Sequence, residues 1–212
     1  MCIKEAMQGF IIQINRVKEE DLIVNIVSQN GLETLYRFYG ARHGSINIGF
    51  LIDFETQKSQ KSTIARLKDV VHIGFGWIHD YKRLHLWQDF IKLFYPHLKD
   101  TDEFESFYFE LLYEASQKWG KQNPKRVAVE AYVKLLEHEG RLHENMECFL
   151  CNNPIQENKI SLVRAFLPTH YGCSHTLPIE KKALLELYKT NSSLFLSDKE
   201  IERLWIILCE GL

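Results

Sequence analysis

The sequence predicts an α+β, multidomain protein in which a small N-terminal β-barrel precedes a helical domain that a cysteine-rich segment interrupts. Up to about residue 78, short apolar runs rich in Ile, Val, Phe and Tyr alternate with turn sequences, a pattern typical of strands. Beyond residue 78 the apolar residues follow a helical period. Three of the five cysteines lie between residues 148 and 173. We therefore expect a barrel over 1–78 and a helical domain over 79–212, interrupted at 147–176.

Five segments of the N-terminal region are predicted to be strands. They are residues 9–15, 21–31, 32–41, 48–55 and 62–75. The turn sequence KEED, at 18–21, separates the first segment from the second. The second and third segments are separated at Asn30-Gly31, a dipeptide typical of two-residue hairpins. Five short antiparallel strands without a long helix between them favour a small barrel.

Four helices are predicted from periodicity and capping residues. In each of the first two helices, apolar residues share one face. In the first helix these residues are Leu84, Trp87, Ile91, Phe94 and Leu98. In the second they are Phe104, Phe107, Leu111, Ala115 and Trp119. The third helix has Asn123 as its N-cap and Pro124 in its first turn, and it stops at Gly140. In the fourth, Ser197 and Glu200 form a capping box. We expect the aromatic residues at helical spacing to be core residues.

The sequence ECFLC at 147–151 has the spacing of half a metal site. A CxxC turn offers two thiolates, and a structural zinc requires two further ligands from a second loop. Downstream, His170 and Cys173 repeat the two-residue spacing, and 18 residues separate Cys151 from His170. This separation falls within the range of about 15–20 residues expected between the pairs of a zinc site. The sequence thus predicts a structural Zn²⁺ held by Cys148, Cys151, His170 and Cys173, which replaces a missing core.

Alternatives remain open for this segment. His175 could replace His170 as a ligand if the second loop is open. The CxxC pair could instead be two half-buried thiols beside surface histidines. A metal-dependent hydrolase would require one of the four ligands to be dispensable, because a catalytic site keeps an open coordination position.

Composition and motifs limit the possible functions. Lys and Arg number 26 against 28 acidic residues, for a net charge of -2, so any binding of nucleic acid must be local. No apolar run approaches the roughly 20 residues needed to cross a bilayer, and the N-terminus lacks a signal-peptide core. We therefore expect a soluble cytoplasmic protein. Phosphate-binding, dinucleotide-binding, serine-hydrolase and zinc-protease motifs are absent, so we do not expect an enzyme.

A mixture of cations and aromatic residues in the N-terminal region favours binding of single-stranded nucleic acid. Bases stack on aromatic faces while cations track the phosphates, and Tyr36 and Phe38 flank the first of these cations. The candidate DNA-binding residues are Arg37, Arg42, Lys58 and Lys61. The alternative is a barrel whose aromatic residues point inward and whose cations are ordinary surface groups.

Residues 19–47, EEDLIVNIVSQNGLETLYRFYGARHGSIN, resemble the RecO family of DNA repair and recombination mediators. Members of that family show an acidic residue ahead of an apolar strand, a hairpin turn with Gly, a second strand, and a Gly-Ala-Arg turn with further cations and Ser. The corresponding residues here are Glu20, Asp21, Leu22, Val24, Gly31, Gly40, Ala41, Arg42 and Ser45. The family's order of an OB-fold followed by a helical domain with a zinc-binding segment is the order predicted above.

The resemblance implies a mediator that binds single- and double-stranded DNA and promotes strand annealing. With RecR, it would help to load RecA onto DNA covered by the single-stranded-DNA-binding protein, SSB. Arg42 carries over as a DNA contact, and Cys148 and Cys151 carry over as zinc ligands. The second pair departs from the paired CxxC of zinc-containing members, and His43 and Gly44 stand where many members are more basic.

The resemblance also implies a cation-edged apolar pocket for the acidic, apolar C-terminal tail of SSB. Lys121, Lys125 and Arg126 beside Val127 are the candidate edge of this pocket. A second hypothesis is a protein–protein adaptor whose barrel never binds DNA, which the near-neutral charge favours. DNA binding at low salt separates the two hypotheses.

Overall fold

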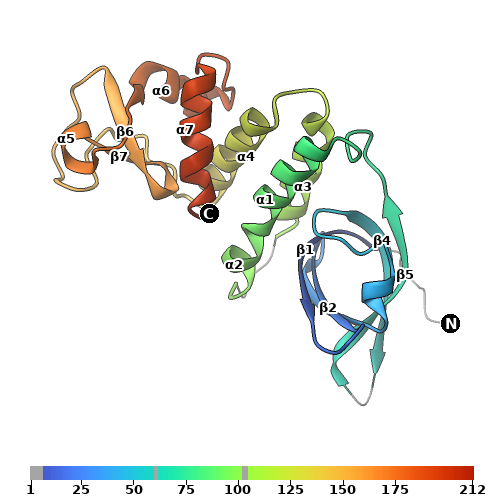
Figure 1. Cartoon of the computed structure of the whole chain (residues 1–212). Coiled ribbons are helices and arrows are strands. Elements are labelled where there is room, and N and C mark those ends of the chain that lie inside the picture. Colours follow the sequence, from blue (N-terminus) through green and yellow to red (C-terminus); the bar gives the residue numbers. More distant parts are fainter. Residues whose placement is uncertain (1–6, 60–61, 102–104) are drawn as a thin grey trace. The chain divides into compact units, whose positions relative to one another are not determined.

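The computed structural model describes residues 7–59, 62–101 and 105–212. The chain forms two compact units, which divide between Gly120 and Lys121. The first unit contains a barrel and three helices, and the second contains the remaining helices and a three-stranded sheet (Figure 1). The last barrel strand ends at Ile73, and the compact unit that contains the barrel continues to Gly120.

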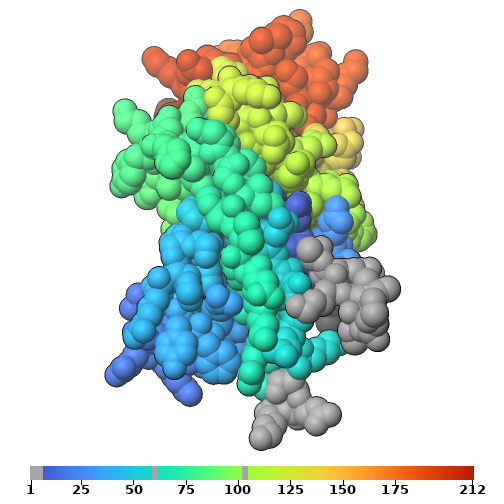
Figure 2. All heavy atoms as spheres, turned by 90° about the vertical axis from the view of Figure 1, so that its right-hand side faces the viewer, coloured from blue at the N-terminus to red at the C-terminus, as the bar shows by residue number. Residues whose placement is uncertain are grey.

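Five strands form a closed barrel in the order β1-β2-β3-β5-β4, and β4 pairs back onto β1 (Figure 1). The strands are β1 (Met7–Arg16), β2 (Leu22–Ser28), β3 (Gly31–Arg37), β4 (Leu51–Ser59) and β5 (Ser62–Ile73). The blue-green segment that contains β5 runs as a ridge along the face shown in Figure 2. A closed five-stranded barrel followed by helices confirms the predicted fold class, a multidomain α+β protein with an N-terminal OB-fold.

Two details of the predicted strand pairing were wrong. The hairpin between β2 and β3 turns at Gln29 and Asn30, one residue earlier than predicted, and Gly31 already pairs with Ser28. The strands are also not all antiparallel, because β3 and β5 pair in parallel through Tyr36 and Arg66. Successive strands reverse direction, so the odd-numbered strands β3 and β5 must run the same way where the barrel closes.

Apolar residues from all five strands fill the barrel. The buried cluster consists of Ile11, Leu22, Val24, Ile26, Leu35, Ile46, Ile52, Phe54 and Leu67. β1 is buried on both faces, since Phe10, Ile11 and Ile12 are all fully buried. Phe10 contacts the rings of Trp87 and Phe109, with centroids 5.8 Å away in each case. β1 therefore reads as a continuous apolar run because it lies between the barrel core and helices.

The helices of the first unit are α1 (Tyr81–Lys92), α2 (Phe94–Leu98) and α3 (Phe107–Trp119). Asp80 caps α1, since its side chain accepts hydrogen bonds from the backbone N–H groups of Lys82 and Arg83. The Trp87 indole Nε1–H donates to the Gly49 carbonyl at 2.8 Å and so joins α1 to the barrel. The residues of the first predicted apolar face are divided between α1 and α2, and those of the second lie on α3, except that Phe104 lies outside the described residues.

Replacing Gly49 with Ala should destabilise the first unit. Gly49 has a φ of +88°, and a Cβ added there would lie 2.7 Å from Cδ1 of Trp87. We expect about 1–3 kcal/mol of overpacking and about 1–2 kcal/mol for a left-handed alanine, measured by urea unfolding. Gly44→Ala is the matched control, because nothing lies within 4 Å of its added Cβ. Equal midpoints for the two variants would contradict the predicted clash.

The second unit consists of helices around a short sheet with the order β7-β6-β8 (Figure 1). Its main helices are α4 (Pro124–His138), α6 (Lys181–Thr190) and α7 (Asp198–Cys209), and its short one is α5 (Tyr171–Ser174). Its strands are β6 (Lys159–Val163), β7 (Leu167–Thr169) and β8 (Ile179–Glu180). The Asn123 cap and the capping box of Ser197 are confirmed. The sequence analysis did not predict α6 or the sheet.

Within the described part of the chain, no helix is both long enough and apolar enough to span a membrane.

Candidate metal centre and nucleic-acid interface

Two loops of the second unit bring four metal-ligating side chains together. In the first loop, the Asn152 N–H donates to the Cys148 carbonyl at 2.8 Å, and Asn152 adopts a φ of 56°. This tight turn places Cys151 beside Cys148. In the second loop, the His170 carbonyl accepts a hydrogen bond from the Cys173 N–H at 3.1 Å as α5 begins. One turn of helix therefore presents His170 and Cys173 together.

The four ligand atoms are close enough together to surround one metal ion. All of them lie within 4.8 Å of one another. Nδ1 of His170 is 3.4 Å from Sγ of Cys151 and 3.9 Å from Sγ of Cys173. Zn–S bonds of about 2.3 Å and Zn–N bonds of about 2.0–2.1 Å place tetrahedral ligand atoms about 3.5–3.8 Å apart. The predicted ligand set, Cys148, Cys151, His170 and Cys173, could therefore hold a metal ion such as zinc.

The backbone orients the imidazole of His170 for metal binding. Nε2 of His170 lies 3.3 Å from the carbonyl oxygen of Pro154. A carbonyl only accepts hydrogen bonds, so Nε2 carries the proton and Nδ1 keeps its lone pair toward the thiols. A backbone carbonyl that fixes the tautomer of a ligating histidine is a common feature of metal sites.

The thiols differ in how easily they ionise. Burial opposes ionisation of Cys148, but the backbone N–H groups of His170, Leu150 and Cys151 prevail and lower its pKa to about 6. Burial, together with the neighbouring thiols of Cys151 and Cys148, raises the pKa of Cys173 to about 11. Three crowded thiols cannot all ionise without a counter-charge, and a divalent cation supplies that charge.

Hydrogen bonds among buried hydroxyl groups hold the second loop. The Thr169 hydroxyl, which precedes His170, contacts the Ser161 carbonyl at 3.2 Å and the Ser174 hydroxyl at 2.8 Å. The Ser161 hydroxyl donates to the Thr176 carbonyl at 2.6 Å. Ser161 and Thr169 are fully buried. These contacts fix the loop that carries His170 against β6.

His175, the alternative ligand, is not part of the four-residue group. It follows α5 in a left-handed conformation with a φ of 55°. Its ring lies edge to face with the ring of Tyr171, with the centroids 6.1 Å apart. The end of α5 therefore separates His175 from Cys173, despite their proximity in sequence.

In the first unit, acidic residues ahead of β2 hold the Gly-Ala-Arg turn. The Asp21 carboxylate accepts hydrogen bonds from the Tyr36 hydroxyl at 2.6 Å and from the Tyr39 N–H at 2.9 Å. These two donors keep the pKa of Asp21 below its usual value. The Glu20 carbonyl accepts from the Ala41 N–H at 3.0 Å. The acidic pair and the turn, which are 20 residues apart in sequence, thus form one structural feature.

Two cation–aromatic pairs are exposed beside this turn. The Arg42 guanidinium lies over the ring of Tyr39 at 5.5 Å, and that of Arg66 lies over the ring of Phe38 at 4.9 Å. Phe38 and Tyr39 expose 45% and 59% of their surface. Arg42 also forms an ion pair with Glu20. These two aromatic residues face solvent and do not belong to the barrel core.

The other predicted DNA-binding residues have different environments. Arg37 is half-buried, and its Nη1 donates to the Leu67 carbonyl at 3.0 Å, which joins β3 to β5. Lys58 is exposed on β4, and Lys61 lies outside the described residues. Sequence reasoning missed Arg66, because its position beside Phe38 follows from the pairing of β3 with β5. The signal in the sequence that could have indicated Arg66 was the presence of cations in the segment that forms β5.

Residues 7–78, which include the barrel and its exposed cation–aromatic pairs, match the family model described as RecO N terminal. These residues are similar to the N-terminal domain of the RecO family. The match confirms the resemblance seen in residues 19–47 and extends it over the whole barrel, while residues 79–212 lie outside the matched region. No curated protein matches the chain. A RecO N-terminal domain supports a general role in DNA repair.

Two of the three cations predicted to edge an SSB pocket have internal roles. Arg126 donates to the carbonyls of Ser193 and Leu196 at 2.6 and 2.8 Å. Lys125 pairs with a carboxylate of α7. Lys121 is exposed. Arg126 thus holds the α6–α7 loop, and Lys125 holds α7. Of the three predicted edge cations, this leaves Lys121.

Proposed function

We propose that this chain is a recombination mediator in DNA repair that binds single- and double-stranded DNA and promotes strand annealing. With RecR, it helps to load RecA onto single strands covered by SSB. The observation that carries the proposal is the pair of exposed stacks, Arg42 on Tyr39 and Arg66 on Phe38, on a RecO N-terminal domain. The protein acts by binding and is not an enzyme.

Single-stranded DNA suits this surface for two physical reasons. Aromatic rings and guanidinium planes stack with bases of any sequence, while the guanidinium charges neutralise phosphates. Because the chain as a whole carries a net charge of -2, the attraction is local and its affinity falls with salt. Lys58 adds a cation on β4 and Arg37 adds one on β3, and Lys61, outside the described residues, remains a proposed contact.

The zinc of the second unit has a structural role in this proposal. Three thiolates and one imidazole fill a tetrahedral coordination shell, which leaves no position for a catalytic water. The SSB tail and RecR remain proposed partners, with Lys121 as the cation available to an acidic tail.

Replacing both Arg42 and Arg66 with Ala should weaken binding of a labelled single-stranded oligonucleotide at low salt. Each phosphate contact contributes about 0.7 to the slope of log affinity against log salt, so the slope should fall by about 1.4. Fluorescence anisotropy across a salt series measures both the affinity and the slope. Phe38→Ala should weaken binding without changing the slope, because stacking releases no counterions.

The matched control is the double variant Lys82→Ala and Lys118→Ala, which removes two exposed cations from helices of the same unit. Its affinity should stay close to that of the parent. Equal losses in both double variants would mean that only total charge matters and would remove the assigned site. Absence of DNA binding by the folded parent at low salt would instead support the adaptor hypothesis.

A further inference from the structure

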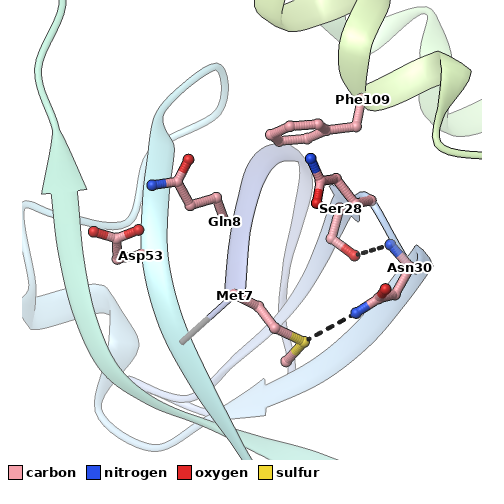
Figure 3. Close-up of a pocket in the computed structure, with 7 residues that line it drawn as sticks. Met7, Gln8, Ser28, Asn30, Asp53 and Phe109 are labelled. Atoms are coloured by element: carbon pink, nitrogen blue, oxygen red, sulfur yellow. Dashed lines mark hydrogen bonds between the residues drawn. The ribbon is translucent and has the colours of Figure 1, made fainter. Parts of the chain in front are cut away.

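A second candidate site lies in a pocket of the first unit, where the start of β1, the β2–β3 hairpin, β4 and α3 meet. Its volume is about 570 Å³, within the usual range for small-molecule sites. Gln8 and Asp53 lie on one side, Asn30 lies on the other, and the ring of Phe109 lies above them (Figure 3). Gln29 also lines the pocket. The pocket thus combines amide side chains, one carboxylate and an aromatic ring.

The polar groups of this pocket are available to a ligand. Within the described part of the chain, the Gln8 and Gln29 amides and the Asp53 carboxylate make no side-chain hydrogen bond or ion pair. Among the described residues, the Asn30 amide reaches the sulfur of Met7, at 3.7 Å (Figure 3), and a thioether is a weak acceptor. These side chains therefore offer both donors and acceptors, with Asp53 as the charged acceptor.

The lining favours a guanine base over other ligands. The described lining residues include no Lys or Arg, so a phosphate group finds no counter-charge there. A carboxylate binds best to two adjacent N–H donors, which guanine presents at N1 and N2. Amide N–H groups can donate to guanine O6, and the Phe109 ring offers an apolar wall for a planar base. A guanidinium has donors alone and would leave the amide donors without partners.

We propose that this pocket binds a guanine base, from a nucleoside or from an unstacked nucleotide of a single strand. The Asp53 carboxylate accepts hydrogen bonds from guanine N1–H and N2–H, as in other proteins that recognise the Watson–Crick edge of an extruded base. This inference goes beyond the proposed function, since it involves neither Arg42 nor Arg66. A nucleoside carries no phosphate, so failure of one proposal leaves the other standing.

The test is a titration of the full chain with guanosine, inosine, adenosine and cytidine, followed by saturation-transfer NMR. Guanosine should bind about tenfold more tightly than inosine, which lacks the 2-amino group, because one good pair of base contacts discriminates by about five- to a hundredfold. The same preference should appear in single strands when dG is replaced by deoxyinosine. Equal binding of the nucleosides, or no binding, would overturn the proposal.

Substitutions give a second, independent readout. Asp53→Asn should lose guanosine binding about tenfold or more and gain xanthosine binding, because the Asn amide donates to the carbonyl at C2 of xanthine. Asp100→Asn removes a carboxylate that is 87% exposed outside the pocket, and it should leave guanosine binding unchanged. Binding of N-acetylarginine amide in preference to guanosine would assign the pocket to a protein partner and overturn the proposal. If Asp53→Asn does not fold, the guanosine-to-inosine ratio still decides.

Discussion

Replacing Cys148 with Ser is expected to abolish stoichiometric zinc binding and to unfold the segment over 147–176. Cys148 is 1% exposed, and three backbone N–H groups are directed at its sulfur, so no other side chain can replace it. Structural zinc supplies about 10 kcal/mol or more of apparent binding free energy in small zinc domains. This binding free energy stabilises the fold, because the site does not exist in the unfolded chain.

The expected loss can be located as well as measured. Emission spectroscopy gives the zinc content, and hydrogen exchange followed by mass spectrometry reports protection peptide by peptide. Protection should be lost in β6, β7 and the two ligand loops, while the barrel keeps its protection. Cys209→Ser is the control, since Cys209 is an exposed cysteine of the same unit outside the ligand group. Full protection in a metal-free Cys148→Ser protein would show that the thiols are ordinary packing groups.

Replacing Trp87 with Ala should cost about 3–5 kcal/mol of the stability of the first unit. Trp87 is fully buried, and its ring contacts those of Phe10, Trp77, Phe90 and Trp119 at centroid distances of 5.0–6.0 Å. The change also leaves the Gly49 carbonyl without its donor, which adds a desolvation penalty. Urea unfolding measures the difference.

Two further variants test whether the loss of stability comes from the packing of Trp87 and not from any substitution in α1. Trp87→Phe keeps part of the aromatic packing but loses the indole donor and some ring volume, so its cost should be smaller than that of Trp87→Ala. Tyr81→Ala lies on the same helix at a residue that is 79% exposed, so it should change little. A loss below about 1 kcal/mol for Trp87→Ala would mean that α1 does not depend on the barrel.

Local spacing rules predicted those parts of the protein that local geometry determines. The group of four residues that could hold a metal ion follows from two pairs with matching separations, and the barrel follows from five short apolar runs. The position of Arg66 beside Phe38 depends on which strands meet when the barrel closes, and no short-range pattern contains that information. The sheet of the second unit was missed because β8 has two residues and β7 has three, too few for a periodic signal.

The junction between β3 and β5 links recognition to the integrity of the barrel. Within the described residues, the backbone pairing there is that of Tyr36 with Arg66, and the Arg37 side chain adds a hydrogen bond to the Leu67 carbonyl. A DNA strand lying on Phe38 and Arg66 would therefore span the junction and hold its two edges together. Ligand occupancy would then raise the unfolding temperature of the barrel, and mutations that alter DNA affinity at this face would also alter how firmly the barrel stays closed.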